Sequence, residues 1–299
     1  MRSSSGHRLN SDGGLSHFGK ALWMALNALN NVWFPNAKDK SLALGDFAPD
    51  LTGEHWRQSH AGKASPSRTL SNLFLMQLPW EHIQDELGRI NIVDVGCGSG
   101  NSSPRLQSWS GGRVATYTGV DVRSHENWKN VESLHAECRF FCADADDIGN
   151  HLSGDANLIV SQSAIEHFRN DVDFFSAMRT FVGRNRKPVI QLHLFPSAAG
   201  LRLYRWHGVR QYTPRTVSLL TRMFNNCSYS RLYWLGGAQC NAVHAEFMTT
   251  PLFARARVDS RLYGDRVCTA ISGDSASVQG APSFYALVIH SHARERIFQ

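Results

Sequence analysis

Helical periodicity dominates the first part of the chain. Between His17 and Phe34 the apolar residues recur at the 3.6-residue spacing of an amphipathic helix, at Phe18, Leu22, Ala25, Leu29 and Trp33. The opposite face carries asparagines and little charge. The pattern predicts a helix that ends before Pro35 and packs its apolar stripe on the core or over a ligand. Docking to a membrane surface or to a partner is the alternative.

Flanking this helix, the sequence predicts less structure. Residues 1–16 are rich in Ser and Gly and are expected to be loose, and residues 35–66 are expected to form a loop because they combine proline and glycine with little periodicity. Two further helices are predicted over 67–78 and 80–87. Residues 1–66 are therefore interpreted as an N-terminal extension and 67–299 as the main domain.

From Arg89 onward, short apolar runs alternate with helical stretches. The runs predict strands at 91–95, 115–122, 139–143, 157–162, 188–195, 229–235 and 283–291. Continuous apolar strands separated by helices are typical of a parallel sheet covered on both faces. The last two strands are separated by a long insert, residues 236–282.

Composition excludes several classes of protein. With 42% hydrophobic and 19% charged residues, the 299-residue chain is too apolar for a disordered protein and too polar for a membrane bundle. The polar start lacks the apolar segment of a signal peptide. The six cysteines form no CxxC pair, so no zinc ribbon is indicated and reduced thiols in the cytoplasm are expected.

The charge is unevenly distributed. The net charge is +6, and between Asp173 and Glu246 the chain has no acidic residue while it carries ten basic ones. This region favours an anionic partner; the alternative is a solvated basic face. Aromatic residues alternate with the arginines from Arg202 to Arg231, which suits stacking on sugars or bases and pairing with phosphate.

A glycine turn directly follows the first strand of this alternating region, in the run Asp94-Val95-Gly96-Cys97-Gly98-Ser99-Gly100-Asn101. Such a turn lets a ligand approach the backbone and exposes the amino end of the next helix. The dinucleotide fingerprint GxGxxG fails at Asn101. The acid before the turn would repel a pyrophosphate but suits a cationic group such as the amino group of an amino acid.

Two further acids stand at strand ends. Asp121, after the second strand of this region, is placed to accept both hydroxyls of a ribose. Asp144, after the third, is placed to accept the exocyclic amine of adenine. Together with Asp94, these acids match an aminoacyl group, a ribose and an adenine in order along one sheet edge.

The runs VDVGCGSG, GVDV, FFCADA and NLIVSQSAIEHF resemble the class I S-adenosylmethionine-dependent methyltransferases, in their small-molecule, type 11-like branch. The resemblance covers residues 90–195. It implies a Rossmann-like, seven-stranded, mostly parallel α/β sheet with helices on both faces, N-terminal helices that cover the cofactor, and S-adenosyl-L-methionine as that cofactor. The cofactor-binding residues that it implies are Asp94, Gly96, Cys97, Gly98, Asp121, Val122, Asp144, Ala145 and Ser161.

For catalysis we expect a general base when the acceptor is a hydroxyl. His193 ranks first, His207 second, and Glu166 is expected to orient one of them; the alternative for His193 is a satisfied polar residue in the sheet. No metal is expected. The (N/D)PPY run of adenine amino-methylating enzymes and the Pro-Cys nucleophile of cytosine C5 enzymes are missing.

The predicted function is O-methylation of a small molecule or saccharide, with an anionic acceptor favoured by the basic stretch. RNA remains an alternative, as does a lipid, because Glu166 and His193 also resemble a Glu–His pair of cyclopropane-fatty-acid synthases. Peripheral membrane contact through the first helix belongs with the lipid alternative. A non-catalytic binding protein of the same fold is the third; the intact Asp94, Gly96, Gly98 and Asp121 argue against it.

Overall fold

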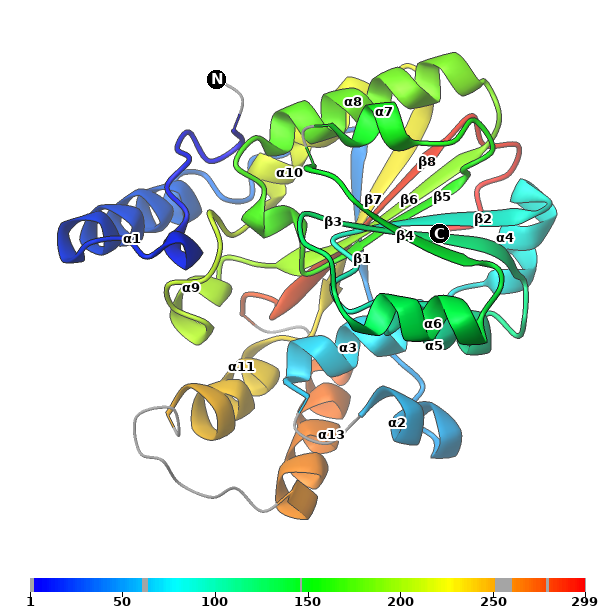
Figure 1. The fold of residues 1–299 in the computed structure, drawn as a ribbon. Helices are drawn as coiled ribbons and strands as arrows, with labels where there is room; N and C mark the ends of the chain where they lie inside the picture. Colours follow the sequence, from blue (N-terminus) through cyan, green and yellow to red (C-terminus); the bar gives the residue numbers. More distant parts are fainter. Residues whose placement is uncertain (1–2, 61–63, 146, 251–259, 278–279, 299) are drawn as a thin grey trace.

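The computed structural model describes residues 3–60, 64–145, 147–250, 260–277 and 280–298, and in them an eight-stranded sheet crosses the molecule (Figure 1). The strand order is β1-β7-β8-β6-β5-β2-β3-β4. The strands are β1 (Leu42–Asp46), β2 (Ile90–Val95), β3 (Val114–Asp121), β4 (Cys138–Cys142), β5 (Leu158–Gln162), β6 (Val189–Pro196), β7 (Ser228–Leu235) and β8 (Phe284–Ser291).

All seven predicted strands are present, and the predicted α/β class is confirmed. The strand count is corrected to eight, because β1 lies in the segment predicted as a loop and pairs parallel with β7 at the sheet edge. Among the strands of the described residues, only β8 runs antiparallel, between β6 and β7. The carboxyl ends of β2, β3, β4 and β5 therefore meet at one edge, as a ligand site requires.

Helices cover both faces of the sheet (Figure 1). They are α1 (His17–Val32), α2 (Gly53–Ser59), α3 (Pro66–Met76), α4 (Trp80–Leu87), α5 (Ser102–Trp109), α6 (Asn127–Leu134), α7 (Ile148–His151), α8 (Asp171–Asn185), α9 (Gly200–Leu203), α10 (Pro214–Thr221), α11 (Ala238–His244) and α13 (Ser260–Ala276). Strand alternation divides the core in two: Ile90 and Ile92 face α3 and α5, whereas Val93 and Val95 face α7 and α8.

The insert between β7 and β8 carries α11 and α13, which pack on α3. Asp274 fixes the start of α11, because its carboxylate accepts hydrogen bonds from the N–H groups of Gly237, Gln239 and Cys240. The insert thus extends the layer of helices on one face of the sheet.

The first residues are ordered against the body of the protein, contrary to the expectation of a loose segment. Ser4 donates hydrogen bonds from both its N–H and its hydroxyl to Asp171, at the start of α8. Arg210 is fully buried and donates to the hydroxyls of Ser3 and Ser5. Contacts with residues more than 160 positions away therefore hold this segment, and local composition does not reveal them.

Helix α1 is present where it was predicted, but its orientation is the reverse of the favoured one. Asn27, Asn30 and Asn31 are buried, whereas the whole predicted apolar stripe is exposed. The Nε1–H of Trp23 donates to the carbonyls of Gly208 and Val209, and further bonds join α1 to residues 209–215. The polar face is therefore the packing face, because its side chains donate hydrogen bonds to the backbone carbonyls of Gly208 and Val209.

The described residues contain no helix long and apolar enough to cross a membrane. All six cysteines are free.

Candidate functional site

The glycine turn brings the ends of β2 and β5 together. Gly96 has a φ of +79°, and a Cβ atom at this position would lie 2.4 Å from the Cβ atom of Ala164. A side chain is therefore excluded both by the backbone conformation and by the close approach of the segment after β5. Gly98, with a φ of +55°, has open space where its Cβ atom would be.

Hydrogen bonds fix the turn to β3. The N–H groups of Gly96 and Cys97 donate to the carbonyl of Val120, at 2.8 and 3.1 Å. The N–H of Gly98 donates to Oδ2 of Asp121 at 2.8 Å, and the carbonyl of Gly98 accepts from Nε1 of Trp128 at 2.8 Å. The Asp121 carboxylate is thus held at the end of β3, next to the turn.

A cavity of about 1040 Å³ opens beside this carboxylate. Its lining comes from the ends of β2, β3, β4 and β5 and from the N-terminal segment. The lining residues are Arg8, Asn10, Asp12, Val95, Gly96, Val120, Asp121, Val122, Arg123, His125, Ala143, Asp144, Ala145, Ser163, Ala164, His167, Phe168, Arg169 and Asn170. This volume and the mixture of acids, bases and apolar groups suit a nucleoside-sized ligand.

Of the residues predicted to bind the cofactor, Gly96, Asp121, Val122, Asp144 and Ala145 line this cavity. Gly98 is not among the lining residues, but its N–H donates a hydrogen bond to Asp121, which lines the cavity. Cys97 and Ser161 are buried and are not among the lining residues. Ser163, two positions after Ser161, lines the cavity instead, with a φ of +54° that is unusual for serine.

Asp94 lies beneath the turn rather than in the large cavity. It lines a second, narrow cavity together with Asn72, Ser102 and Gln162. Tyr117 donates a hydrogen bond from its hydroxyl to Oδ2 of Asp94 at 2.6 Å. Burial raises the pKa of Asp94 to about 6, although the bond from Tyr117 opposes this shift. Asp94 and Val95 thus reach the two cavities from adjacent positions on β2.

His193 is placed in the core, away from the large cavity. Its ring is fully buried, packs edge-on against Phe174 and Phe175 of α8, and Nδ1 lies 2.8 Å from the Ser161 hydroxyl. Burial lowers the pKa of His193 to about 3. This position matches the structural alternative for His193, because a base must reach the acceptor.

Glu166, by contrast, is brought together with two histidines. It lies in a single 3-10 turn, Ile165–His167, directly after β5. Its Oε1 is 3.9 Å from Nε2 of His167 and 3.9 Å from Nε2 of His207, and the two rings pack edge to face. Burial raises the pKa of Glu166 to about 7, and burial together with His167 lowers that of His207.

The sequence reasoning missed the contribution of the N-terminal segment. Arg8, Asn10 and Asp12 line the cavity, and Oδ2 of Asp12 lies 2.6 Å from Nδ1 of His167. No periodicity or motif marks these residues. This segment, rather than the predicted helices, lies along the cavity, since α3 and α4 pack into the core under the sheet.

The basic stretch also has a more structural role than expected. The guanidinium of Arg210 donates to the carbonyls of Phe168 and Arg169 and pairs with Asp171 at 3.4 Å. Arg215 donates to the side chain of Asn30 on α1. These two arginines therefore hold the N-terminal region in place.

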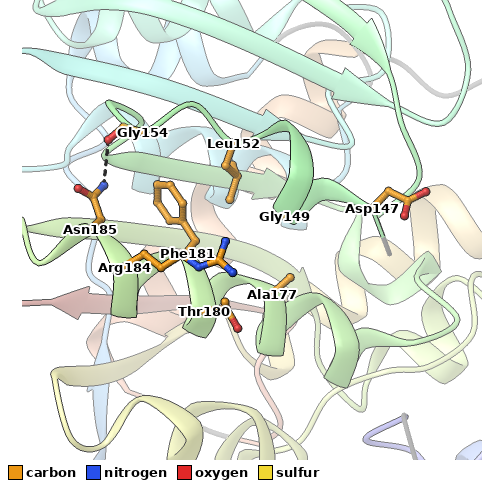
Figure 2. A pocket seen from close by; sticks show the side chains of 9 residues that line it. All are labelled: Asp147, Gly149, Leu152, Gly154, Ala177, Thr180, Phe181, Arg184 and Asn185. Carbon is orange, nitrogen blue, oxygen red and sulfur yellow. Dashed lines mark hydrogen bonds between the residues drawn. The ribbon is translucent and has the colours of Figure 1, made fainter.

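A further cavity, of about 560 Å³, lies between α7 and α8 (Figure 2). Its described lining includes Asp147, Phe181, Arg184 and Asn185, and Nδ2 of Asn185 donates to the carbonyl of Gly154 at 3.2 Å. None of the turn residues or strand-end acids lines it. It is therefore a weaker candidate for the chemistry than the cavity at Asp121.

Comparison with known proteins agrees with this site. Residues 92–184 match the family model described as a methyltransferase domain. No curated protein sequence matches the chain. Because the matched residues run from β2 to α8, they contain the glycine turn, Asp121, Asp144 and Glu166.

Solved structures match the chain at low identity. The plantazolicin methyltransferase BamL, in complex with a desmethyl analogue and SAH, is 15% identical with a TM-score of 0.47; the match covers 75% of this chain and 85% of that one. A SAM-dependent methyltransferase from Archaeoglobus fulgidus is 14% identical with a TM-score of 0.46, covering 80% and 100%. The [4+2]-cyclase SpnF is 12% identical with a TM-score of 0.45, covering 91% and 94%.

The family match, the sheet order and the glycine turn agree on a methyltransferase domain over residues 92–184.

Proposed function

We propose that this chain is an S-adenosylmethionine-dependent methyltransferase, which binds its cofactor across the glycine turn and methylates an oxygen of a small molecule or saccharide. The observation that carries the proposal is the Asp121 carboxylate, held by the Gly98 N–H at the rim of the 1040 Å³ cavity. Two hydroxyls of a ribose match the acceptor oxygens of this carboxylate. Asp144 and Ala145 are assigned to the adenine, and Asp94 to the methionine end.

The acceptor is assigned to the side of the cavity lined by His167, whose ring packs edge to face on His207 and lies 3.9 Å from Glu166. Arg8 and Arg169 line the same cavity and favour an acceptor with a carboxylate or phosphate. Methyl transfer is an in-line displacement, so positioning supplies much of the acceleration. His207 is assigned as the group that receives the hydroxyl proton, with Glu166 orienting it.

Two histidine variants test this assignment. His207→Gln is expected to reduce turnover by about 10²-fold or more, since a general base contributes at least that much, while affinity for S-adenosylmethionine stays unchanged. His193→Gln should retain turnover if it folds, because its ring is fully buried against α8, whereas the ring of His207 is partly exposed and packs on His167, which lines the cavity. The opposite result, with turnover lost only in His193→Gln, would restore His193 as the base.

An acceptor screen tests the substrate class. The full chain is incubated with methyl-labelled S-adenosylmethionine and with phenols, sugars, sugar phosphates, acyl lipids or RNA, and products are identified by mass. Labelling of a hydroxylated small molecule or sugar supports the proposal. Labelling of RNA or of an acyl chain alone would overturn the acceptor class and leave the methyltransferase assignment intact.

We also infer that residues 67–299 form the methyltransferase domain and that 1–66 is an extension that adds the edge strand β1 to its sheet and a wall to its site. Arg8, Asn10 and Asp12 support this role because they line the cavity. A chain that begins at residue 14 is expected to lose acceptor turnover. Full turnover in such a chain would contradict it.

A further inference from the structure

The cluster of Glu166, His167 and His207 has the composition of a metal site. Each residue offers one ligand atom, and the three atoms all lie within 4.8 Å of one another. Two imidazoles and one carboxylate are a common ligand set for divalent transition metals. The residues come from the turn after β5 and from the loop between α9 and α10, so folding is required to bring them together.

The carboxylate of Glu166 lacks the partners that a buried acid needs. It is 1% exposed, and neither oxygen has a hydrogen-bond partner among the described residues. The backbone carbonyl of Glu166 does have them, because it accepts from the N–H groups of Val209 and Arg210. An unpartnered buried carboxylate is costly, and a bound cation would remove that cost.

A second carboxylate orients one of the histidines. Oδ2 of Asp12 lies 2.6 Å from Nδ1 of His167, which leaves Nε2 directed to Glu166. Oδ1 of Asp12 accepts from the N–H of Gly208, the residue after His207. A carboxylate that fixes the tautomer of a histidine from its far side is a recurrent feature of metal sites.

We propose that Glu166, His167 and His207 bind one divalent transition-metal ion such as Zn²⁺, Co²⁺ or Mn²⁺. Bonds of about 2.0–2.1 Å in tetrahedral geometry place ligand atoms about 3.3 Å apart. The two separations of 3.9 Å therefore need to shorten by roughly 0.6 Å, which small rotations of the partly exposed histidine rings supply. A fourth position remains for water or for the acceptor.

This inference rests on the proposed function and gives the site a role in it. With the ion bound, His207 is a ligand and the ion takes over the activation of the acceptor: coordination would lower the pKa of the hydroxyl, whose proton would pass to water. The resulting oxygen attacks the methyl carbon of the sulfonium; the new O–C bond forms as the C–S bond breaks, and the electron pair goes to sulfur. The products are the methylated acceptor and the neutral thioether, and the ion is unchanged.

Calorimetric titration of the untagged, chelator-treated full chain with ZnCl₂ tests the site, with CoCl₂ absorption as a spectroscopic check. One equivalent is expected to bind, and Glu166→Gln and His207→Gln are expected to weaken binding at least tenfold. His82→Gln, an exposed histidine on α4, is the matched control and should bind as the original chain does. Glu166→Gln is checked for folding by circular dichroism, and His207 is exposed enough for its variant to fold.

The outcomes separate this inference from the proposed function. SAH binding without metal binding, or metal binding that is unchanged in both cluster variants, would overturn the metal site alone. A folded chain that binds metal but neither SAH nor S-adenosylmethionine would overturn the proposed function instead.

The exposed stripe of α1 independently carries a second inference. Along the outer side of the helix and just beyond it, Phe18, Leu22, Leu29, Val32, Trp33 and Phe34 are between 40% and 78% exposed. Ala21, Ala25 and Ala28 fill the space between them, so this face is apolar along its full length. A 16-residue helix is about 24 Å long, so the stripe exceeds the scattered apolar residues of an ordinary surface.

The surroundings of the stripe are cationic. Residues 13–38 contain no acid and carry Lys20 and Lys38. Lys20 lies 5.4 Å from the ring centroid of Trp206, which is itself 46% exposed. Apolar and aromatic side chains with flanking cations are typical of helices that lie in the interface of an anionic bilayer.

We infer that α1 docks on an anionic membrane surface with this stripe in the acyl boundary. Co-sedimentation with phosphatidylglycerol–phosphatidylcholine vesicles should capture the full chain, and less of it at high salt. The double variant Leu29→Gln/Val32→Gln should bind the vesicles at least tenfold more weakly. Leu134→Gln, which changes an exposed leucine of α6, should bind them as the original chain does. If the full chain stays in the supernatant, whether as a monomer or as a dimer formed through α1, the inference is overturned.

Discussion

The sheet and α1 handle polar groups in opposite ways. In the sheet, apolar side chains of both faces are buried, and the acids Asp121 and Asp144 stand at the strand ends that line the large cavity. On α1 the asparagines are buried and the apolar stripe is exposed. The difference arises from what each element packs against: the sheet meets apolar helices, whereas α1 meets the backbone carbonyls of residues 208–209. Hydrogen-bond demand, as well as hydrophobicity, therefore decides which face of a helix is inside.

The largest loss of stability is expected from a variant that removes a side chain holding the N-terminal region. Arg210→Met removes the ion-pair partner of the buried Asp171, which keeps only its hydrogen bonds, and should lower the free energy of unfolding by about 3–5 kcal/mol. Urea denaturation measures it. Arg202→Met, at an exposed position of α9, is the control and should change stability by less than about 0.5 kcal/mol. Equal effects of the two variants would show that the buried network is not what attaches this region.

The next effect sharpens the role of the turn in the sheet. Gly96→Ala combines a left-handed φ with a 2.4 Å approach to Ala164, so we expect a loss of about 2–4 kcal/mol. Gly98→Ala has the unfavourable φ and open space, and should lose only about 1–2 kcal/mol. Thermal unfolding compares them, and the predicted contact with Ala164 is wrong if the two losses match.

Buried histidines in the sheet should make its stability sensitive to acid. Burial lowers the pKa of His193 to about 3. Below about pH 6.5 this histidine therefore binds a proton in the unfolded chain but not in the folded one. Stability is then full above pH 6.5 and falls as the pH decreases toward 3. At pH 5 the loss from His193 is about 2 kcal/mol, which His193→Phe should remove. An unchanged dependence of unfolding free energy on pH between 7 and 5 in this variant would contradict the assignment.

The smallest effects are expected on α1, where replacing a buried asparagine should cost more stability than replacing an exposed leucine. Asn27→Leu removes the hydrogen bonds from Nδ2 of Asn27 to the carbonyls of Trp23 and Val209 and should destabilise by about 1–2 kcal/mol. Leu29→Asn, on the exposed stripe, should cost about 0.5 kcal/mol. Chemical denaturation of both variants gives the comparison, and a larger loss for Leu29→Asn would mean that the stripe is the packed face.

Much of the fold could be predicted because local sequence encodes it. Continuous apolar runs predict the seven strands, and glycines at 96 and 98 predict the turn. The orientation of α1 could not be predicted, because periodicity shows which residues form an apolar stripe but not whether that stripe faces the core or the solvent. Strand parity explains His193: it shares its face of β6 with Val189 and Phe195, which belong to the core under α8. The contribution of Asp12 and the meeting of His207 with Glu166 depend on contacts between distant segments, for which one sequence holds no signal.

The central claim is that Asp121 and the glycine turn bind S-adenosylmethionine, and calorimetric titration of the full chain with S-adenosylmethionine and SAH tests it most directly. We expect both ligands to bind and Asp121→Ala to bind more than roughly tenfold more weakly, because hydrogen bonds to a charged group contribute about 1.5–3 kcal/mol. A folded chain that binds neither ligand, or a folded Asp121→Ala variant with unchanged affinity, would contradict the claim.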